Sequence, residues 1–178
     1  MKNNVLIVGA GPTGLVLALW LSKQGIAVRI IDKNTESSQS SRALGIHART
    51  LELYQQMDLA EEVIQAGYPN VQLNLWASGK KRGVLKLIEQ GKTLTPYPFI
   101  LIYPQDQHER LLMRHLEKFG VHVERSSELL SFTHHAEHIC AEIRTLQGVE
   151  HYSARFMAAC DGGKSPIRHL LRLKFSGG

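Results

Sequence analysis

Cysteine and long apolar runs are scarce in this sequence. Only two cysteines, Cys140 and Cys160, occur in 178 residues. Two cysteines cannot build a framework of several disulfides, and such low usage is typical of a reducing compartment. No apolar run reaches the roughly 18 to 20 residues of a membrane span. The N-terminal apolar segment contains several glycines and lacks a small-residue cleavage site, so we do not expect a signal peptide. We therefore expect a cytoplasmic protein with no membrane partner.

Runs of a single charge are also scarce. The formal net charge is +5, from 21 lysines and arginines against 16 acidic residues. The only tight basic run is Lys80, Lys81 and Arg82, and the other basic residues are scattered among acids. A nucleic-acid-binding protein usually gathers its basic residues on one face or stripe. We expect instead a solvated surface with mild attraction for anions, and no nucleic-acid partner.

The first part of the chain has the pattern of a βαβ unit. The run NVLIVGA is short, β-branched and apolar, as in a strand buried on both faces. The segment GLVLALWLSKQG then follows helical spacing and closes at Gly25, and AVRIID is a second strand. Strand, helix and strand in this order predict an α/β fold with a parallel sheet and a right-handed crossover.

The remainder of the chain mixes helices with short strands. We expect a helical region over 42–67, broken near Met57 and Asp58, and an amphipathic helix over 106–120 that leads into a third parallel strand over 121–126. Short strands over 70–94, with turns at ASGKKRG and EQGK, predict the start of an antiparallel layer. Three further runs, LLSFTHH, HICAEIRT and EHYSARFMAAC, predict a β-meander that ends at an Asp-Gly corner.

Three glycines, Gly9, Gly11 and Gly14, give G-x-G-x-x-G between the first strand and the first helix. The first allows a tight turn, the second lets backbone approach a pyrophosphate, and the third lets helix and strand pack closely. The phosphates would lie at the helix N-terminus. Asp32 ends the second strand, where a carboxylate can accept hydrogen bonds from ribose hydroxyls and would repel a 2′-phosphate. The pattern predicts binding of FAD or NAD, but not of NADP, in this loop.

Four segments carry a resemblance to a known family. They are VLIVGAGPTGLVLALWLSKQGIAVRIIDK, RALGIHARTLELYQQMDL, YPQDQHERLLMRHLEKFGVHVERSSEL and ACDGGKSPIR. In this order and spacing they resemble the N-terminal portion of the FAD-dependent aromatic hydroxylases, the family of para-hydroxybenzoate, phenol and polyketide hydroxylases. TPYPFILIYPQDQHERLL is most similar to the phenol and polyketide branch.

The resemblance implies a Rossmann-like FAD-binding domain over 1–69 and 100–178, with 70–99 supplying the first strands of a substrate domain. It implies a flavin monooxygenase that hydroxylates an aromatic substrate with O₂ and with NAD(P)H as transient reductant. Members of the family continue well beyond this length, so the chain is expected to be the N-terminal part of the enzyme. The alternatives are a non-catalytic FAD- or nucleotide-binding module and, less favoured, an NAD-dependent dehydrogenase.

The resemblance also implies roles for individual residues. With Gly9 in the turn, Gly11, Pro12, Thr13 and Gly14 would face the FAD pyrophosphate. Asp32 would bind the adenosine ribose, with Lys33 beside it. Arg42 would reach the phosphates or the ribityl chain; a guanidinium suits bidentate phosphate contact, and the alternative is a surface arginine.

Three later positions complete the expected cofactor site. Gln105 would bond the ribityl hydroxyls, or would simply open a helix. The backbone of Leu129 would meet the adenine edge, and Asp161 in the Asp-Gly corner would help to hold FAD. Ser165 and Pro166 after that corner are a typical N-cap and first helical residue.

Other candidate chemistries receive less support. THHAEHIC contains three histidines and a cysteine, but adjacent histidines on a strand point to opposite faces, so we predict no metal site. Cys160 is expected to be a buried small residue. No Ser-His-Asp set, paired carboxylates or P-loop is visible in the sequence, which suits a flavoenzyme whose cofactor carries the chemistry. The sequence alone does not identify a catalytic residue.

Overall fold

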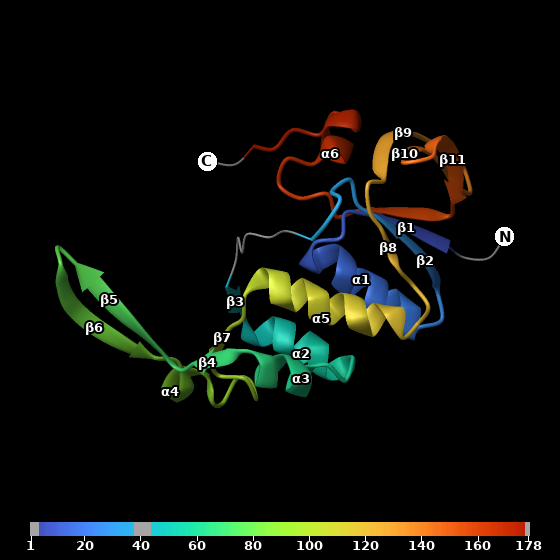
Figure 1. Ribbon diagram of the computed structural model, residues 1–178. Helices are drawn as coiled ribbons and strands as arrows, with labels where there is room; N and C mark the ends of the chain where they lie inside the picture. The colour runs from blue at the N-terminus through green and yellow to red at the C-terminus, as the bar shows by residue number, and fades with distance from the viewer. Residues whose placement is uncertain (1–3, 38–43, 177–178) are drawn as a thin grey trace. The chain divides into compact units, whose positions relative to one another are not determined.

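The computed structural model describes residues 4–37 and 44–176 (Figure 1). The chain forms two compact units. The first contains Met1–Gln39 and Glu109–Gly178, and the second contains Ser40–His108. The predicted substrate-domain strands of 70–99 lie inside the second unit, and their assignment to a substrate domain stays a prediction. None of the described helices is long and apolar enough to cross a membrane.

A parallel sheet organises the first unit, in the strand order β12-β1-β2-β8. Its strands are β1 (Asn4–Val8), β2 (Ala27–Ile31), β8 (Val123–Glu124) and β12 (Phe156–Ala159). Helix α1 (Pro12–Lys23) connects β1 to β2 and packs against both strands. The predicted βαβ unit and third parallel strand are therefore confirmed.

A three-stranded antiparallel meander packs against one face of this sheet (Figure 1). It consists of β9 (Glu128–His134), β10 (Ile139–Thr145) and β11 (Gly148–Ala154). Leu6 and Val8 of β1 share a core with Ala141 and Ile143 of β10. Since side chains alternate along a strand, Val5 and Ile7 point to the other face, the one available to α1. The parallel sheet thus separates two apolar layers.

A cluster of charged side chains links the meander to the parallel sheet. The Arg29 guanidinium of β2 donates to both carboxylate oxygens of Glu124 in β8, at 2.9 and 2.6 Å, and also to Glu150 of β11. It lies 4.5 Å from the ring centre of Tyr152. The hydrogen bonds to Glu124 contribute most to raising the pKa of Arg29 above its usual range. Arg29 therefore stays charged and links three strands.

The second unit combines short strands with short helices. In chain order its elements are β3 (Gly45–Ile46), α2 (Ala48–Gln56), α3 (Ala60–Ala66), β4 (Tyr68–Asn70), β5 (Gln72–Ala77), β6 (Lys80–Lys86), α4 (Leu87–Gly91) and β7 (Ile100–Ile102). Strands β3, β7 and β4 form one antiparallel sheet, and β5 and β6 form a hairpin. Helix α5 (Gln105–Glu117) contains the boundary between the units.

Three details of the sequence prediction are wrong. Gly45 and Ile46 were assigned to a helix but form β3, because their backbone pairs with Ile102 and Leu101. The EQGK segment was assigned to a turn, yet most of it belongs to helix α4. The expected helix break near Met57 and Asp58 is confirmed.

The third correction concerns the last run of the meander. EHYSARFMAAC was expected to be one strand, but it divides at Arg155 into β11 and β12. The Arg155 backbone N–H donates to the Asn4 side-chain oxygen at 3.0 Å. After this bend β12 joins β1 in parallel, with Val5 opposite Phe156 and Val8 opposite Ala159. The chain thereby leaves the meander and completes the parallel sheet.

A buried polar pair lies in the core of the second unit. The Tyr54 hydroxyl of α2 and His108 Nε2 of α5 are 2.8 Å apart, and the residues are 1% and 5% exposed. The ring of Tyr103 lies 5.7 Å from that of His108. Burial lowers the pKa of His108 from 6.5 to about 4, and burial raises the pKa of Tyr54. Both side chains are consequently neutral at physiological pH.

We predict that His108 makes the chain less stable in mild acid. Between about pH 6.5 and pH 4, the His108 imidazole is protonated in the unfolded chain but stays neutral in the folded chain. The free energy of unfolding should therefore fall by up to roughly 3 kcal/mol as the pH drops through this window. The measurement is urea unfolding at a series of pH values.

The variant His108→Gln keeps a hydrogen-bonding group opposite Tyr54 but cannot titrate, so its stability should depend less steeply on pH over this window. His169→Gln, at an exposed position, should keep the wild-type slope. Equal slopes for His108→Gln and the wild type would contradict the prediction.

Candidate functional site

The loop between β1 and α1 is built on two close backbone contacts. Gly9 has φ of +105°, and a Cβ on it would lie 2.2 Å from the carbonyl oxygen of Cys160. A Cβ on Gly14 would lie 1.9 Å from the carbonyl oxygen of Gly9. Neither position can hold a side chain unless the backbone moves. The glycines that the sequence assigned to the turn and to helix–strand packing therefore have those structural roles.

Asp32 holds this loop from the end of β2. Its Oδ2 accepts the Ala10 backbone N–H at 2.7 Å, and its Oδ1 accepts the backbone and side-chain N–H groups of Asn34 at 2.8 and 2.9 Å. The residue is only 8% exposed. Hydrogen bonds among the described residues thus use three of about four carboxylate lone-pair sites and leave one acceptor site. The carboxylate shapes the loop and keeps some capacity to bind a ligand.

Arg125 lies beside Asp32 and is not among the predicted site residues. Its Nη1 is 3.8 Å from Asp32 Oδ1, and Nη2 is 3.4 Å from the Met113 sulfur. The backbone N–H of Ser127, two residues further on, donates to the Asp32 carbonyl at 3.0 Å. Its place in the sequence could have indicated this role, because Arg125 directly follows the third parallel strand. The carboxyl ends of β2 and β8 meet at one edge of the sheet, and so do the residues that follow them.

The Asp-Gly corner lies against the glycine loop. Backbone of Cys160 and Asp161 occupies the space next to Gly9. Asp161 Oδ2 accepts the Ile167 N–H at 3.0 Å, and Ser165 Oγ accepts the Arg168 N–H at 3.0 Å. These bonds hold the start of α6 (Pro166–Leu170), which confirms the predicted N-cap at Ser165.

The thiol of Cys160 is not an activated nucleophile. Burial and, to a smaller extent, the neighbouring Asp161 carboxylate raise the pKa of this thiol. A protonated, half-buried thiol is a weak nucleophile. The sequence predicts a buried small residue here, but Cys160 is only half-buried; its backbone and Cβ lie against the glycine loop.

The start of α1 at Gly11 has free space around it, whereas Gly9 and Gly14 are in close contact with backbone atoms. Among the described residues, a Cβ built on Gly11 meets no atom within 4 Å. Gly11 is the N-cap of α1, no described side chain caps this helix, and its first turn contains no acidic residue. The backbone N–H groups and the positive end of the helix dipole therefore favour negative charge at this position. Thr13 is exposed in the first turn, and Gly11 and Pro12 are half-buried.

The remaining predicted site residues differ in their surroundings. Lys33 is exposed directly after Asp32, in the same loop. The Leu129 side chain is buried in the core between the sheet and the meander, so only its backbone is available for the predicted adenine contact. Gln105 begins α5 and lies in the second unit. Arg42 lies outside the described residues. The first unit thus brings Gly9–Gly14, Asp32, Lys33 and Asp161 to one edge of its sheet.

A family model described as "FAD binding domain" matches residues 2–178. The chain belongs to this family of FAD binding domains. The predicted resemblance to FAD-dependent hydroxylases is therefore confirmed, and the fold agrees with it.

Two curated relatives of this FAD binding domain are monooxygenases. The chain is 34% identical over 174 residues to 6-methylpretetramide 4-monooxygenase of Streptomyces rimosus, covering 97% of this chain and 31% of the relative. It is 33% identical over 170 residues to rifampicin monooxygenase of Rhodococcus hoagii, covering 94% and 33%. The chain thus spans about a third of the length of these relatives.

A solved structure supports the same assignment. Aklavinone-11 hydroxylase, in a ternary complex with FAD and aklavinone, superposes on the FAD binding domain with a TM-score of 0.87 and 26% sequence identity. The match covers 96% of this chain and 35% of that one. The superposition extends over nearly the whole FAD binding domain.

We predict that substitution of two glycines of the loop changes stability by different amounts. Gly14→Ala would force a methyl group against the Gly9 carbonyl and should lower the free energy of unfolding by about 1 to 3 kcal/mol. Gly11→Ala should change it by less than about 1 kcal/mol, because a stiffer unfolded chain and a poorer N-cap have opposing effects. Chemical unfolding of the FAD-free chain measures both. A Gly14→Ala variant as stable as Gly11→Ala would contradict the packing described here.

Proposed function

We propose that this chain binds FAD at the carboxyl edge of its parallel sheet, as the FAD-binding part of a flavin-dependent monooxygenase. The enzyme would hydroxylate an aromatic substrate, phenolic or polyketide-like, with O₂ and NAD(P)H. When bound, FAD supplies the redox and oxygen-transfer chemistry, which amino-acid side chains do not carry. The chain's own residues would bind, orient and shield the cofactor.

The open space at Gly11 is the observation that carries the proposal. Gly9 and Gly14 are glycines because protein backbone fills the space of a Cβ, whereas nothing in the described chain fills that space at Gly11. A ligand that approaches the backbone closely explains a glycine there. The uncapped N-terminus of α1 favours an anionic ligand, and a pyrophosphate has the required charge and size.

Asp32 and its neighbours suit the adenosine half of the cofactor. The remaining acceptor site of the carboxylate can take a hydrogen bond from a ribose hydroxyl. Arg125, 3.8 Å away, and the exposed Lys33 would partly balance the added negative charge of the pyrophosphate. The residual carboxylate charge disfavours a 2′-phosphate, so NADP is the least suitable dinucleotide here.

The relatives support the reaction type. Two are named as monooxygenases, of 6-methylpretetramide and of rifampicin, and the third is a hydroxylase whose complex contains FAD and aklavinone. The chain covers about a third of each, so hydroxylation, the aromatic substrate and the use of NAD(P)H belong to the proposal for the whole protein.

We predict that Gly11→Ala will lose FAD affinity without losing its fold. The added methyl group would occupy the position of closest approach to the pyrophosphate, and a misfit of this kind should weaken FAD binding about tenfold or more. The measurement is titration of FAD-free chain with FAD, followed by flavin absorbance and fluorescence.

Gly83→Ala is the matched control, because among the described residues its methyl group meets only Leu75 Cδ1, at an ordinary 3.8 Å in the β5–β6 hairpin. This variant should bind FAD as the wild type does. Unchanged FAD affinity in Gly11→Ala would reject the proposed position of the pyrophosphate. A wild-type chain that takes up no FAD would reject the cofactor proposal altogether.

The reaction type needs a separate experiment on the natural gene product. NADH or NADPH oxidation that rises when a phenolic or polyketide compound is added, with formation of a hydroxylated product, would support a monooxygenase. FAD binding without any substrate-stimulated oxidation would leave the cofactor assignment standing and count against hydroxylation.

A further inference from the structure

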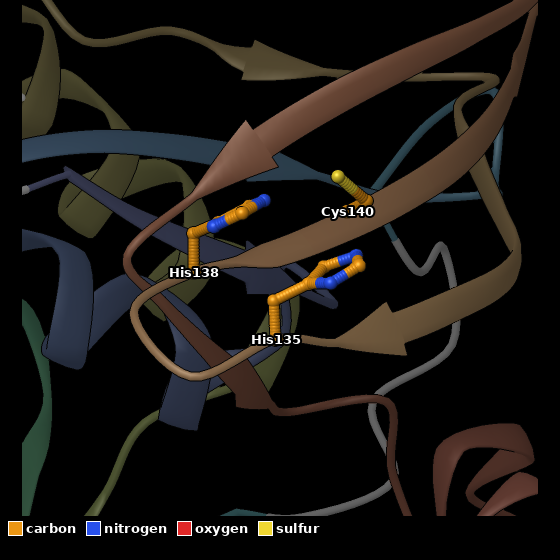
Figure 2. Close-up of side chains that lie close together, drawn as sticks. All are labelled: His135, His138 and Cys140. Carbon is orange, nitrogen blue, oxygen red and sulfur yellow. The ribbon is translucent and has the colours of Figure 1, made fainter.

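Two histidines and a cysteine converge at the tip of the β9–β10 hairpin. The imidazole nitrogens of His135 and His138 and the sulfur of Cys140 offer ligand atoms that all lie within 4.8 Å of one another (Figure 2). His135 is exposed, and the other two residues are half-buried. Figure 2 shows all three side chains pointing into the same space beside the hairpin.

The register of the hairpin explains this convergence. The His135 N–H donates to the His138 carbonyl at 2.8 Å across a two-residue turn, so the histidines face each other. Cys140 pairs with Thr133, two residues before His135, and lies two residues after His138. Since side chains two apart share a face of a strand, the three ligands share the face opposite Ala141. His134 pairs with Ile139 on the other face.

Alternation of side chains along the strands therefore places His134 on the opposite face. It leaves His135, His138 and Cys140 together on one face. Alternation along one strand, applied to the adjacent pair His134 and His135, led to the prediction of no metal site. Pairing across the turn instead brings together residues with the spacing H-x-x-H-x-C. This spacing is the sequence signal that was overlooked.

We propose that His135, His138 and Cys140 bind a Zn²⁺ ion. Imidazole nitrogen and thiolate sulfur are the ligands that Zn²⁺ prefers, with bond lengths of about 2.0 and 2.3 Å. Tetrahedral coordination at these lengths separates ligand atoms by roughly 3.3 to 3.7 Å. The atoms need to approach by little more than 1 Å, and the fourth position is left to water.

Side-chain rotation is sufficient for this approach. The two imidazole rings are stacked, with centres 4.6 Å apart and planes 15° apart. Rotation about the Cβ–Cγ bond, a torsion with a broad energy profile, turns a nitrogen of each ring towards the common centre. The Cys140 thiol releases its proton to solvent as the Zn–S bond forms. The bound ion would link the end of β9 to the start of β10.

Cobalt titration of the untagged chain tests the site. Co²⁺ adopts the same geometry, and a cysteine ligand gives a thiolate-to-cobalt charge-transfer band in a difference spectrum that cancels any flavin absorption. We expect one equivalent of Co²⁺ to produce this band and Zn²⁺ to abolish it. Zn²⁺ should also raise the melting temperature, because it binds the folded hairpin.

Substitutions with matched controls identify the ligands. Loss of a residue that only hydrogen-bonds to a metal ligand weakens metal binding about 10- to 100-fold. Loss of a ligand itself, in Cys140→Ser or His135→Ala, should therefore weaken Zn²⁺ binding at least about 100-fold. His134→Ala, on the other face, and Cys160→Ser, the other cysteine, should keep the band and the affinity.

His135→Ala changes an exposed side chain, so its effect is not confused with misfolding. The proposal is wrong if Zn²⁺ affinity survives both Cys140→Ser and His135→Ala, or if wild-type chain binds less than stoichiometric metal without a thiolate band.

Discussion

At the end of β1 the backbone turns through Gly9, and the carbonyl of Cys160 fills the space where a side chain would begin. Gly14 then lies against the Gly9 carbonyl, so α1 starts on top of the turn. Two segments that are far apart in the sequence thereby meet without an intervening side chain. Strand β12 runs alongside β1 and places Cys160 at this position, so a side chain on Gly9 would clash with the residue that follows β12. The tight loop leaves the face of Gly11 as the place for a ligand.

Asp32 connects this contact to the next strands. One carboxylate oxygen holds Ala10, and the Asp32 carbonyl accepts a bond from Ser127 after β8. The glycine loop, β2 and β8 are therefore held together before any ligand arrives. Such preorganisation reduces the ordering cost of binding. It also means that removal of the Asp32 side chain would disturb the loop as well as any ribose contact, so effects of Asp32 variants on FAD affinity do not by themselves prove a direct contact.

Local patterns predicted much of this arrangement, and non-local pairings account for what was missed. The turn at Gly9, the close packing at Gly14, the βαβ unit and the N-cap at Ser165 depend on neighbouring residues, and these structural predictions are confirmed. The division of EHYSARFMAAC at Arg155 depends on Asn4, at the opposite end of the sequence, and no period-2 pattern can reveal it. Arg125 was overlooked for the same reason, because its meaning comes from the pairing of β8 with β2.

The hairpin cluster shows how a hydrophobic core can fix polar chemistry on the surface. Ala141 and Ile143 are completely buried against the parallel sheet, and this burial sets the face that each residue of β10 presents. A slip of one residue would turn Cys140 towards the core and expose Ala141. The apolar contacts would oppose that slip, because they would be lost along the whole strand. The register that aligns His135, His138 and Cys140 is thus maintained by residues on the opposite face, and the three ligands need no stabilising contact of their own to stay together.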